Sequence, residues 1–161
     1  MAAPSPIRIL VDADACPVKD EIYRVAERRR VLVSVVSNSP FRVPVGPLVE
    51  RVVVDGGFDA ADDWIAERAA LRQAQGERTV VVTGDILLAD RCVKAGATVL
   101  APTGKPFTSA SIGGAIATRA IMADLRAGLG EGVGGPAPFA KADRSRFLQA
   151  LDEALMRLGR A

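Results

Sequence analysis

The chain has 161 residues, 49% of them hydrophobic, and a formal net charge of +2, values that fit one globular domain and are too weakly basic to indicate a nucleic-acid partner alone. It contains no histidine, which excludes Ser-His-Asp triads, histidine acid–base catalysis and zinc sites built with imidazole. No apolar run approaches the ~20 residues that cross a bilayer, and residues 1–6 lack a signal-peptide pattern, so we expect a cytoplasmic protein without membrane contact.

The first part of the chain alternates short apolar runs with amphipathic stretches. Residues 7–11 predict a strand that ends at Asp12, and the spacing of the apolar residues that follow predicts a helix with Pro17 at its first position. That helix should end near the arginines at 28–30, because basic side chains interact favourably with the C-terminal end of a helix dipole. Residues 31–36, which are almost entirely apolar, predict a buried strand.

The same alternation continues to residue 107. A proline-rich loop follows the second strand, Asp59 opens a helix, and a later helix ends at Gly96. Three more strands are predicted, at residues 51–54, 79–83 and 97–100. Strands that alternate with helices in this way imply a parallel sheet with right-handed crossovers.

The last third of the chain indicates helices. Thr108 and Ser109 can cap a helix that runs to about residue 127, and a loop rich in glycine and proline follows at 128–138. A final helix carries an apolar stripe from Phe147 to Leu158.

We therefore predict an α/β fold of three layers. A mostly parallel central sheet of about five strands is flanked by helices, and the C-terminal third is helical. Residues 1–161 form a single domain, with a strand and helix core at 6–107 and C-terminal helices at 108–161.

Polar and acidic side chains gather where the predicted strands end. They are Asp12, Asp14, Ser37, Asn38, Asp55, Asp59, Asp62, Asp63, Thr83, Asp85 and Asp90. Ligands of open parallel sheets bind outside the carboxyl ends of the strands, so carboxylates from three strands should meet at one edge. Such groups repel one another unless a cation lies between them, and oxygen ligands favour Mg²⁺ or Mn²⁺ over zinc.

Each of these residues also has a structural interpretation. Asp85 directly precedes a helix and could be its N-cap, Asp59 and Asp62 have the spacing of a capping pair, and Asp14 could interact with a helix dipole. Ser37 and Asn38 could hydrogen-bond a phosphate or cap a turn. Asp63 is expected to be a solvated helix residue.

The two cysteines, Cys16 and Cys92, are expected to be reduced thiols. Cys16 lies at a predicted helix N-terminus, a place that lowers thiol pKa. Without a histidine partner, a buried small residue is the favoured interpretation over a nucleophile.

Several motifs together resemble the uncharacterised bacterial YaiI/YqxD family. They are residues 11–19 (VDADACPVK), 36–38 (VSN), 57–65 (GFDAADDWI) and 83–89 (TGDILLA), with Arg119, the Gly134-Gly135-Pro136 turn, Asp143-Arg144 and Phe147. That family is similar to the PIN-like nuclease superfamily, so the resemblance implies a sheet flanked by helices with an acidic edge that binds a metal.

The resemblance also implies roles for particular residues. Mapped by position, the catalytic carboxylates would be Asp12, Asp14, Asp62, Asp85 and Asp90. Of these, Asp12, Asp62 and Asp85 would hold Mg²⁺ or Mn²⁺. Ser37, Asn38, Lys105 and Arg119 would contact the substrate. The implied activity is hydrolysis of RNA or another phosphate ester.

Two other functions remain open at this point. Asp12-x-Asp14 after an apolar strand has the form of the first motif of haloacid-dehalogenase-type phosphatases, in which the first aspartate is a nucleophile. That superfamily also needs a lysine, which Lys94 or Lys105 would supply. The third hypothesis is a non-catalytic module that binds RNA or protein with a degenerate site.

Overall fold

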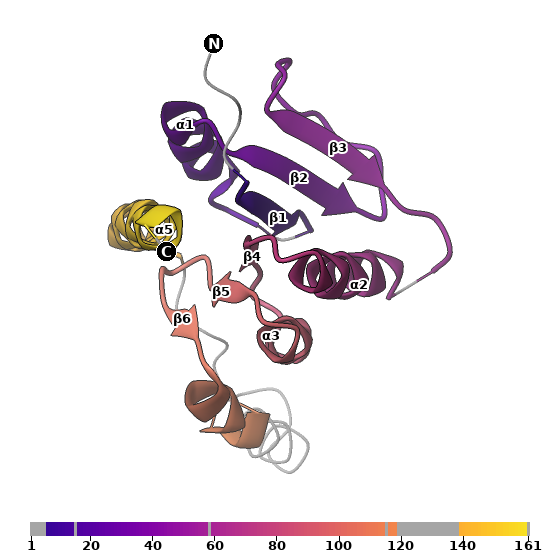
Figure 1. The fold of residues 1–161 in the computed structure, drawn as a ribbon, viewed down its shortest axis with the longest axis vertical. Helices are drawn as coiled ribbons and strands as arrows, with labels where there is room; N and C mark the ends of the chain where they lie inside the picture. Colours follow the sequence, from indigo (N-terminus) through magenta and orange to yellow (C-terminus); the bar gives the residue numbers. More distant parts are fainter. Residues whose placement is uncertain (1–5, 15, 58, 115, 119–138, 161) are drawn as a thin grey trace, which may run out of the picture.

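A six-stranded sheet forms the centre of the molecule in the computed structural model, which describes residues 6–14, 16–57, 59–114, 116–118 and 139–160 (Figure 1). The strands are β1 (Arg8–Asp12), β2 (Leu32–Ser37), β3 (Val49–Val53), β4 (Thr79–Val82), β5 (Thr98–Leu100) and β6 (Pro106–Phe107). Their order across the sheet is β3-β2-β1-β4-β5-β6. All pairs are parallel except β5 with β6, which is antiparallel.

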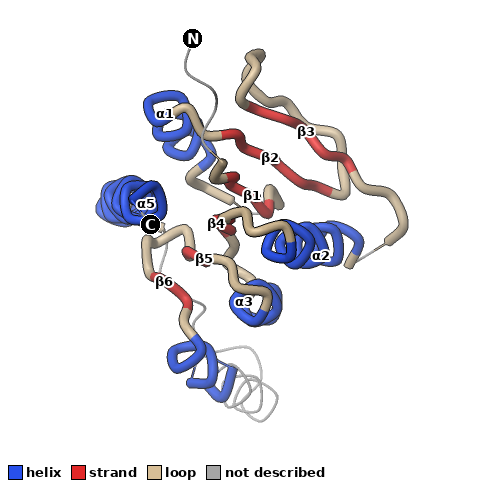
Figure 2. Tube along the Cα trace, in the orientation of Figure 1, coloured by secondary structure: helices blue, strands red, loops and turns tan. Residues whose placement is uncertain are grey.

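Helices cover both faces of this sheet. They are α1 (Lys19–Arg29), α2 (Ala60–Ala74), α3 (Ile86–Lys94) and α5 (Lys141–Arg160). Figure 2 shows α1 and α5 on one face and α2 and α3 on the other. The predicted mostly parallel α/β architecture of three layers is therefore confirmed. No helix within the described segments is long and apolar enough to span a membrane.

The central strands β1, β2 and β4 consist mostly of apolar residues, because they face a core on each side. Ile9 and Val11 of β1 pack in the core beneath α1 and α5, whereas Leu10 points into the core beneath α2 and α3. All three side chains are fully buried.

The structure corrects several details of the predicted elements. The sheet has six strands instead of about five, because residues 106–107 pair with β5 at the edge of the sheet. β3 begins and ends earlier than predicted. Pro17 precedes α1 instead of starting it, since the first helical residue is Lys19 after an N-cap at Val18.

The C-terminal third agrees with the prediction where the structure describes it. Residues 109–114 and 116–118 are helical, and α5 carries the apolar stripe with Phe147 and Leu151 fully buried. The predicted continuation of the first helix to residue 127 and the loop at 128–138 lie outside the described residues.

Candidate functional site

The strand order makes the carboxyl ends of β1 and β4 the place where a ligand is expected. From β1 the chain crosses to β2 and β3 on one side, and α2 then returns it to β4 on the other side of β1. Ligands of open α/β sheets bind at such a topological switch point. Asp12 is the last residue of β1, and Thr83 directly follows β4.

A pocket of about 470 Å³ lies at this switch point. Its lining consists of Asp12, Asp14, Asn38, Ala61, Asp62, Gly84 and Asp85. Four of the five predicted catalytic carboxylates therefore lie around one space, although they come from three separate stretches of chain. We call this space the acidic pocket.

Asp12 is the most strongly perturbed of these carboxylates. The pKa of Asp12 is raised from 3.8 to about 6, chiefly by burial; the hydrogen bond from Thr83 lowers it, and the nearby charges of Asp62, Asp14 and Asp85 contribute to the rise. Thr83 Oγ1 donates to Asp12 Oδ2 at 2.9 Å. A cation in the acidic pocket would stabilise the ionised form of Asp12, because it would offset the repulsion from the neighbouring carboxylates.

Asp14 is exposed and is oriented by β2. Ser37 Oγ donates to Asp14 Oδ1 at 2.7 Å and accepts from the backbone N–H of Ser39 at 3.1 Å. Ser37 is 3% exposed and is absent from the lining of the acidic pocket. The contact of Ser37 within the described residues is therefore with Asp14, which it holds at the rim.

Asp62 lies in the first turn of α2, and Asn38 helps to place that turn. Asn38 Oδ1 accepts from the backbone N–H of Ala61 at 3.1 Å. Burial raises the pKa of Asp62, and Asp85 and Asp59 add to this effect. Asp59 makes no side-chain capping bond to α2, so the alternative of an Asp59–Asp62 capping pair is wrong.

Asp85 combines two roles in one side chain. Its Oδ1 accepts from the backbone N–H groups of Leu87 at 2.9 Å and Leu88 at 3.2 Å, so the N-cap interpretation is confirmed. Oδ2 accepts no bond within the described part of the chain, and the residue lines the acidic pocket. Capping one oxygen leaves the other for a ligand.

Asp90 and Lys105 lie elsewhere than predicted. The Asp90 carboxylate is 2.8 Å from Lys94 Nζ on the exposed side of α3, and it does not line the acidic pocket. Lys105 lines a different pocket, between the loop after β5 and α5. Arg119 lies outside the described residues.

Both cysteines are free, as expected, and neither has the environment of a nucleophile. Burial raises the pKa of the Cys16 thiol, and burial raises that of Cys92 to about 12. Low thiolate content at neutral pH makes both thiols unreactive.

The sequence prediction did not assign a role to Thr83. This residue is 1% exposed, donates to Asp12 and accepts from the backbone N–H of Asp85 at 3.0 Å. It thereby ties two carboxylate-bearing segments together. The only signal in the sequence was its position at the end of an apolar strand, which many threonines share.

The donor set fits Mg²⁺ or Mn²⁺ better than a metal that needs a complete protein cage. Among the described residues, no three Asp, Glu or Cys side chains are placed as a ready-made group of ligands for one ion. Mg²⁺ usually keeps several waters and takes only one or two carboxylates, together with phosphate oxygens of a substrate. Asp12, Asp62 and Asp85 line the same pocket and offer only oxygen donors, but the three are not placed as direct ligands of a single ion.

Comparisons with known proteins identify relatives over nearly the whole chain. A family model described as "Uncharacterized BCR, YaiI/YqxD family" matches residues 10–157. A UPF0178 protein of Sphingopyxis alaskensis is 73% identical over 152 residues, covering 94% of this chain and 95% of the relative. A UPF0178 protein of Nitrobacter winogradskyi is 61% identical over 155 residues, covering 96% and 94%. No solved structure matches the chain.

Proposed function

The chain belongs to the YaiI/YqxD family, and we propose that it hydrolyses phosphodiester bonds of RNA with Mg²⁺ or Mn²⁺. The observation that carries this proposal is the acidic pocket. Asp12, Asp62 and Asp85 come from β1, α2 and the end of β4, yet they line one space at the switch point of the sheet. A group of carboxylates of this kind is typical of enzymes that bind divalent cations and hydrolyse phosphate esters.

The residues of the acidic pocket have different proposed roles, which follow from their different surroundings. Asp12, Asp62 and Asp85 would hold the ion, one or two of them directly and the rest through bound water, and Thr83 hydrogen-bonds the Asp12 carboxylate. When bound, Mg²⁺ or Mn²⁺ supplies a Lewis acid that neutralises phosphate charge and allows water to attack at neutral pH. Asp14, which is exposed and accepts a hydrogen bond from Ser37, would accept a proton from the attacking water.

We assign the fold to the PIN-like nucleases as part of the same proposal. Nucleases of that kind take carboxylates from the first strand, a middle helix and the region of the fourth strand. Asp12, Asp62 and Asp85 occupy those three places here. This correspondence of positions supports the ribonuclease function.

The phosphatase alternative lacks a lysine in the right place. Lys94 is paired with Asp90, and Lys105 lines a different pocket. Within the described residues, no lysine or arginine lines the acidic pocket. The haloacid-dehalogenase-type reaction needs such a cation beside its nucleophile, so the observations favour the nuclease.

The test is RNA cleavage by matched aspartate variants. With Mg²⁺ or Mn²⁺ we expect the unmodified protein to cleave single-stranded RNA, and Asp12→Asn to lower the rate at least about 100-fold, because one metal ligand is lost. Asp63→Asn is the matched control, since Asp63 lies next to Asp62 but is exposed and paired with Arg91 at 2.8 Å. It should stay within about threefold of the unmodified rate.

The same preparation separates the rival functions. Equal cleavage by the unmodified protein and Asp12→Asn would identify a contaminating nuclease. Hydrolysis of p-nitrophenyl phosphate with aspartyl phosphate trapped on Asp12 would establish the phosphatase instead. RNA binding without cleavage, unchanged by EDTA and by Asp12→Asn, would establish a binding module.

A further inference from the structure

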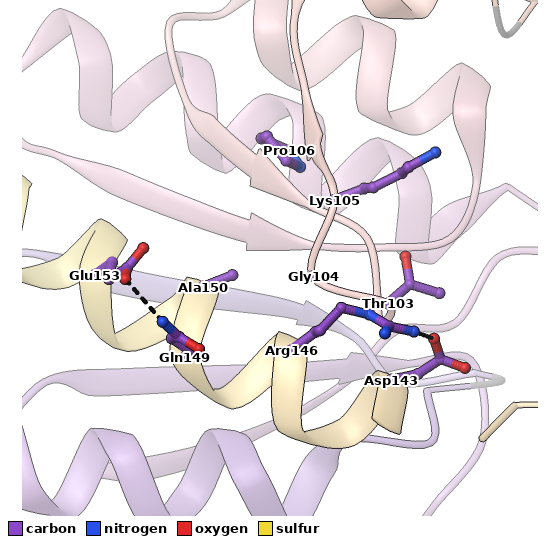
Figure 3. Close-up of a pocket in the computed structure, with 9 residues that line it drawn as sticks. All are labelled: Thr103, Gly104, Lys105, Pro106, Asp143, Arg146, Gln149, Ala150 and Glu153. Atoms are coloured by element: carbon purple, nitrogen blue, oxygen red, sulfur yellow. Dashed lines mark hydrogen bonds and ion pairs between the residues drawn. The ribbon is translucent and has the colours of Figure 1, made fainter. Parts of the chain in front are cut away.

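A second pocket, of about 590 Å³, lies between α5 and the loop at residues 101–105 that follows β5 (Figure 3). We call it the loop pocket. The proposed function does not use it. Thr103 supplies a hydroxyl, Lys105 and Arg146 supply two positive charges, and the carboxylates of Asp143 and Glu153 also line it (Figure 3).

The chain segments that line the two pockets approach each other at Gly84 and Pro102. Gly84 lines the acidic pocket, and a Cβ built on it would lie 3.8 Å from Pro102 Cδ. The backbone N–H of Thr83 donates to the carbonyl of Leu100 at 3.1 Å, which joins the ends of β4 and β5. A strand of nucleic acid that places one phosphate in the acidic pocket would therefore pass over Pro102 to reach the loop pocket.

Arg146 pairs with a carboxylate of its own helix and has further donors to offer. Its Nη2 donates to Asp143 Oδ1, while Asp143 Oδ2 accepts from the backbone N–H of Ala140 at 2.8 Å. The arginine side chain is 64% exposed, and within the described residues its guanidinium uses a single donor. The remaining N–H groups suit a phosphate, whose geometry the planar guanidinium matches. An exposed i,i+3 pair of this kind is worth little, so it does not prevent that contact.

Lys105 and Thr103 add a free charge and a free hydroxyl. Both residues are exposed, and neither side chain has a partner in the described part of the chain. The loop itself is well determined, because the backbone N–H of Ala101 donates to the carbonyl of Lys105 at 2.8 Å and that of Gly104 donates to Ala101 at 2.9 Å. The loop therefore presents both side chains at the same carboxyl edge as the acidic pocket.

We propose that the loop pocket binds a backbone phosphate of an RNA strand whose neighbouring segment enters the acidic pocket, with Arg146, Lys105 and Thr103 as its contacts. The choice of RNA rests on the proposed function. The binding of phosphate rests on Lys105, Arg146 and Thr103, and the pairing of Asp143 with Arg146 leaves Glu153, at the other end of the pocket, as the carboxylate that acts against it. The carboxylates of the acidic pocket repel a polyanion such as RNA, and the positive charges of Lys105 and Arg146 would offset this repulsion.

The experiment measures RNA binding without catalysis. A fluorescent single-stranded RNA of about a dozen nucleotides is titrated in EDTA against the unmodified protein, Lys105→Gln and Arg146→Gln. Arg157→Gln is the matched control, because Arg157 is an exposed arginine at the far end of the same helix and its loss changes net charge equally. Circular dichroism and melting temperature verify that all four proteins are folded.

We expect Lys105→Gln and Arg146→Gln each to weaken binding about three- to tenfold and to reduce the slope of log K against log salt by about one, with Arg157→Gln within twofold. Equal weakening by all three variants would show a net-charge effect and overturn the proposal. Undetectable RNA binding, or inorganic phosphate bound as tightly as RNA, would overturn it as well. Asp12→Asn separates the two proposals. If this variant loses RNA cleavage but still binds RNA, the acidic pocket carries the cleavage and the loop pocket still binds the strand.

Discussion

At the scale of single residues, the acidic pocket shows how environment divides chemically identical side chains. Asp85 uses one oxygen to cap a helix, whereas Asp12 is partly buried among three other carboxylates. Only Asp12 has a pKa raised to about 6, because it is buried at the end of a central strand. This unfavourable burial of a charge has a measurable consequence for stability.

We predict that Asp12→Asn stabilises the metal-free protein at pH 8. The folded-state pKa of Asp12 lies above its ordinary value of 3.8, so the folded protein holds the proton more tightly. The resulting stabilisation is complete below about pH 4 and is lost as the pH rises through about 6. Asparagine keeps a neutral side chain and should add about 1–2 kcal/mol to the free energy of unfolding at pH 8 in EDTA, after allowance for solvent screening.

Urea unfolding at pH 4 and pH 8 in EDTA provides the measurement. The two proteins should have similar stability at pH 4, where Asp12 is protonated. Asp63→Asn is the control, because it removes an exposed carboxylate that pairs with Arg91 and should give no gain at pH 8. A loss of stability in Asp12→Asn at pH 8 would contradict the prediction.

At the scale of elements, turns decide how closely helices approach the sheet. The loop at residues 101–105 packs against α5 through Gly104, which has φ of 90°. A Cβ there would lie 2.8 Å from the carbonyl oxygen of Arg146. The loop can therefore take this position only because residue 104 has no side chain.

We predict that Gly104→Ala destabilises the protein by about 2–4 kcal/mol, since it combines left-handed strain with a clash against backbone. Gly76→Ala is a matched control, because Gly76 has φ of 76° but nothing within 4 Å of its Cβ position. Strain alone should cost it about 1 kcal/mol. Thermal unfolding of both variants tests the difference, and equal losses would mean that the close contact with α5 contributes nothing.

At the scale of the whole molecule, α5 completes one of the two cores. Phe147, Leu151 and Leu155 pack with α1 and with one face of the sheet. Arg28 and Arg29 of α1 both hydrogen-bond Asp152, and Arg144 donates to Glu21 at 3.1 Å, so α5 is joined to α1 near both ends of α1. The C-terminal helix is thus part of the layer that supports β1.

We predict that Phe147→Ala lowers the free energy of unfolding by about 3–5 kcal/mol, because the fully buried ring would leave a cavity. Leu148→Ala, one position along but only partly buried, should cost about 1 kcal/mol. Chemical denaturation followed by circular dichroism compares them. Similar losses for the two variants would show that α5 is not packed as described.

The sequence alone determined the fold class and the edge of the sheet where the carboxylates would meet. Apolar runs and helical spacing can be read from short stretches of sequence. The strands and the helix that they predicted are present in the structure as β1, β2, β4 and the buried stripe of α5. The two-residue β6 has no such pattern, because its pairing with β5 depends on a turn and a distant partner.

Only the tertiary structure decided which acidic residues share the pocket. Asp90 follows the same strand as Asp85, but α3 carries it one turn further to Lys94, away from Asp12. Thr83 gained its importance from a hydrogen bond to a carboxylate 71 residues earlier in the chain. Strand order and helix rotation set these relations, and neither is encoded in the spacing of residues within one segment.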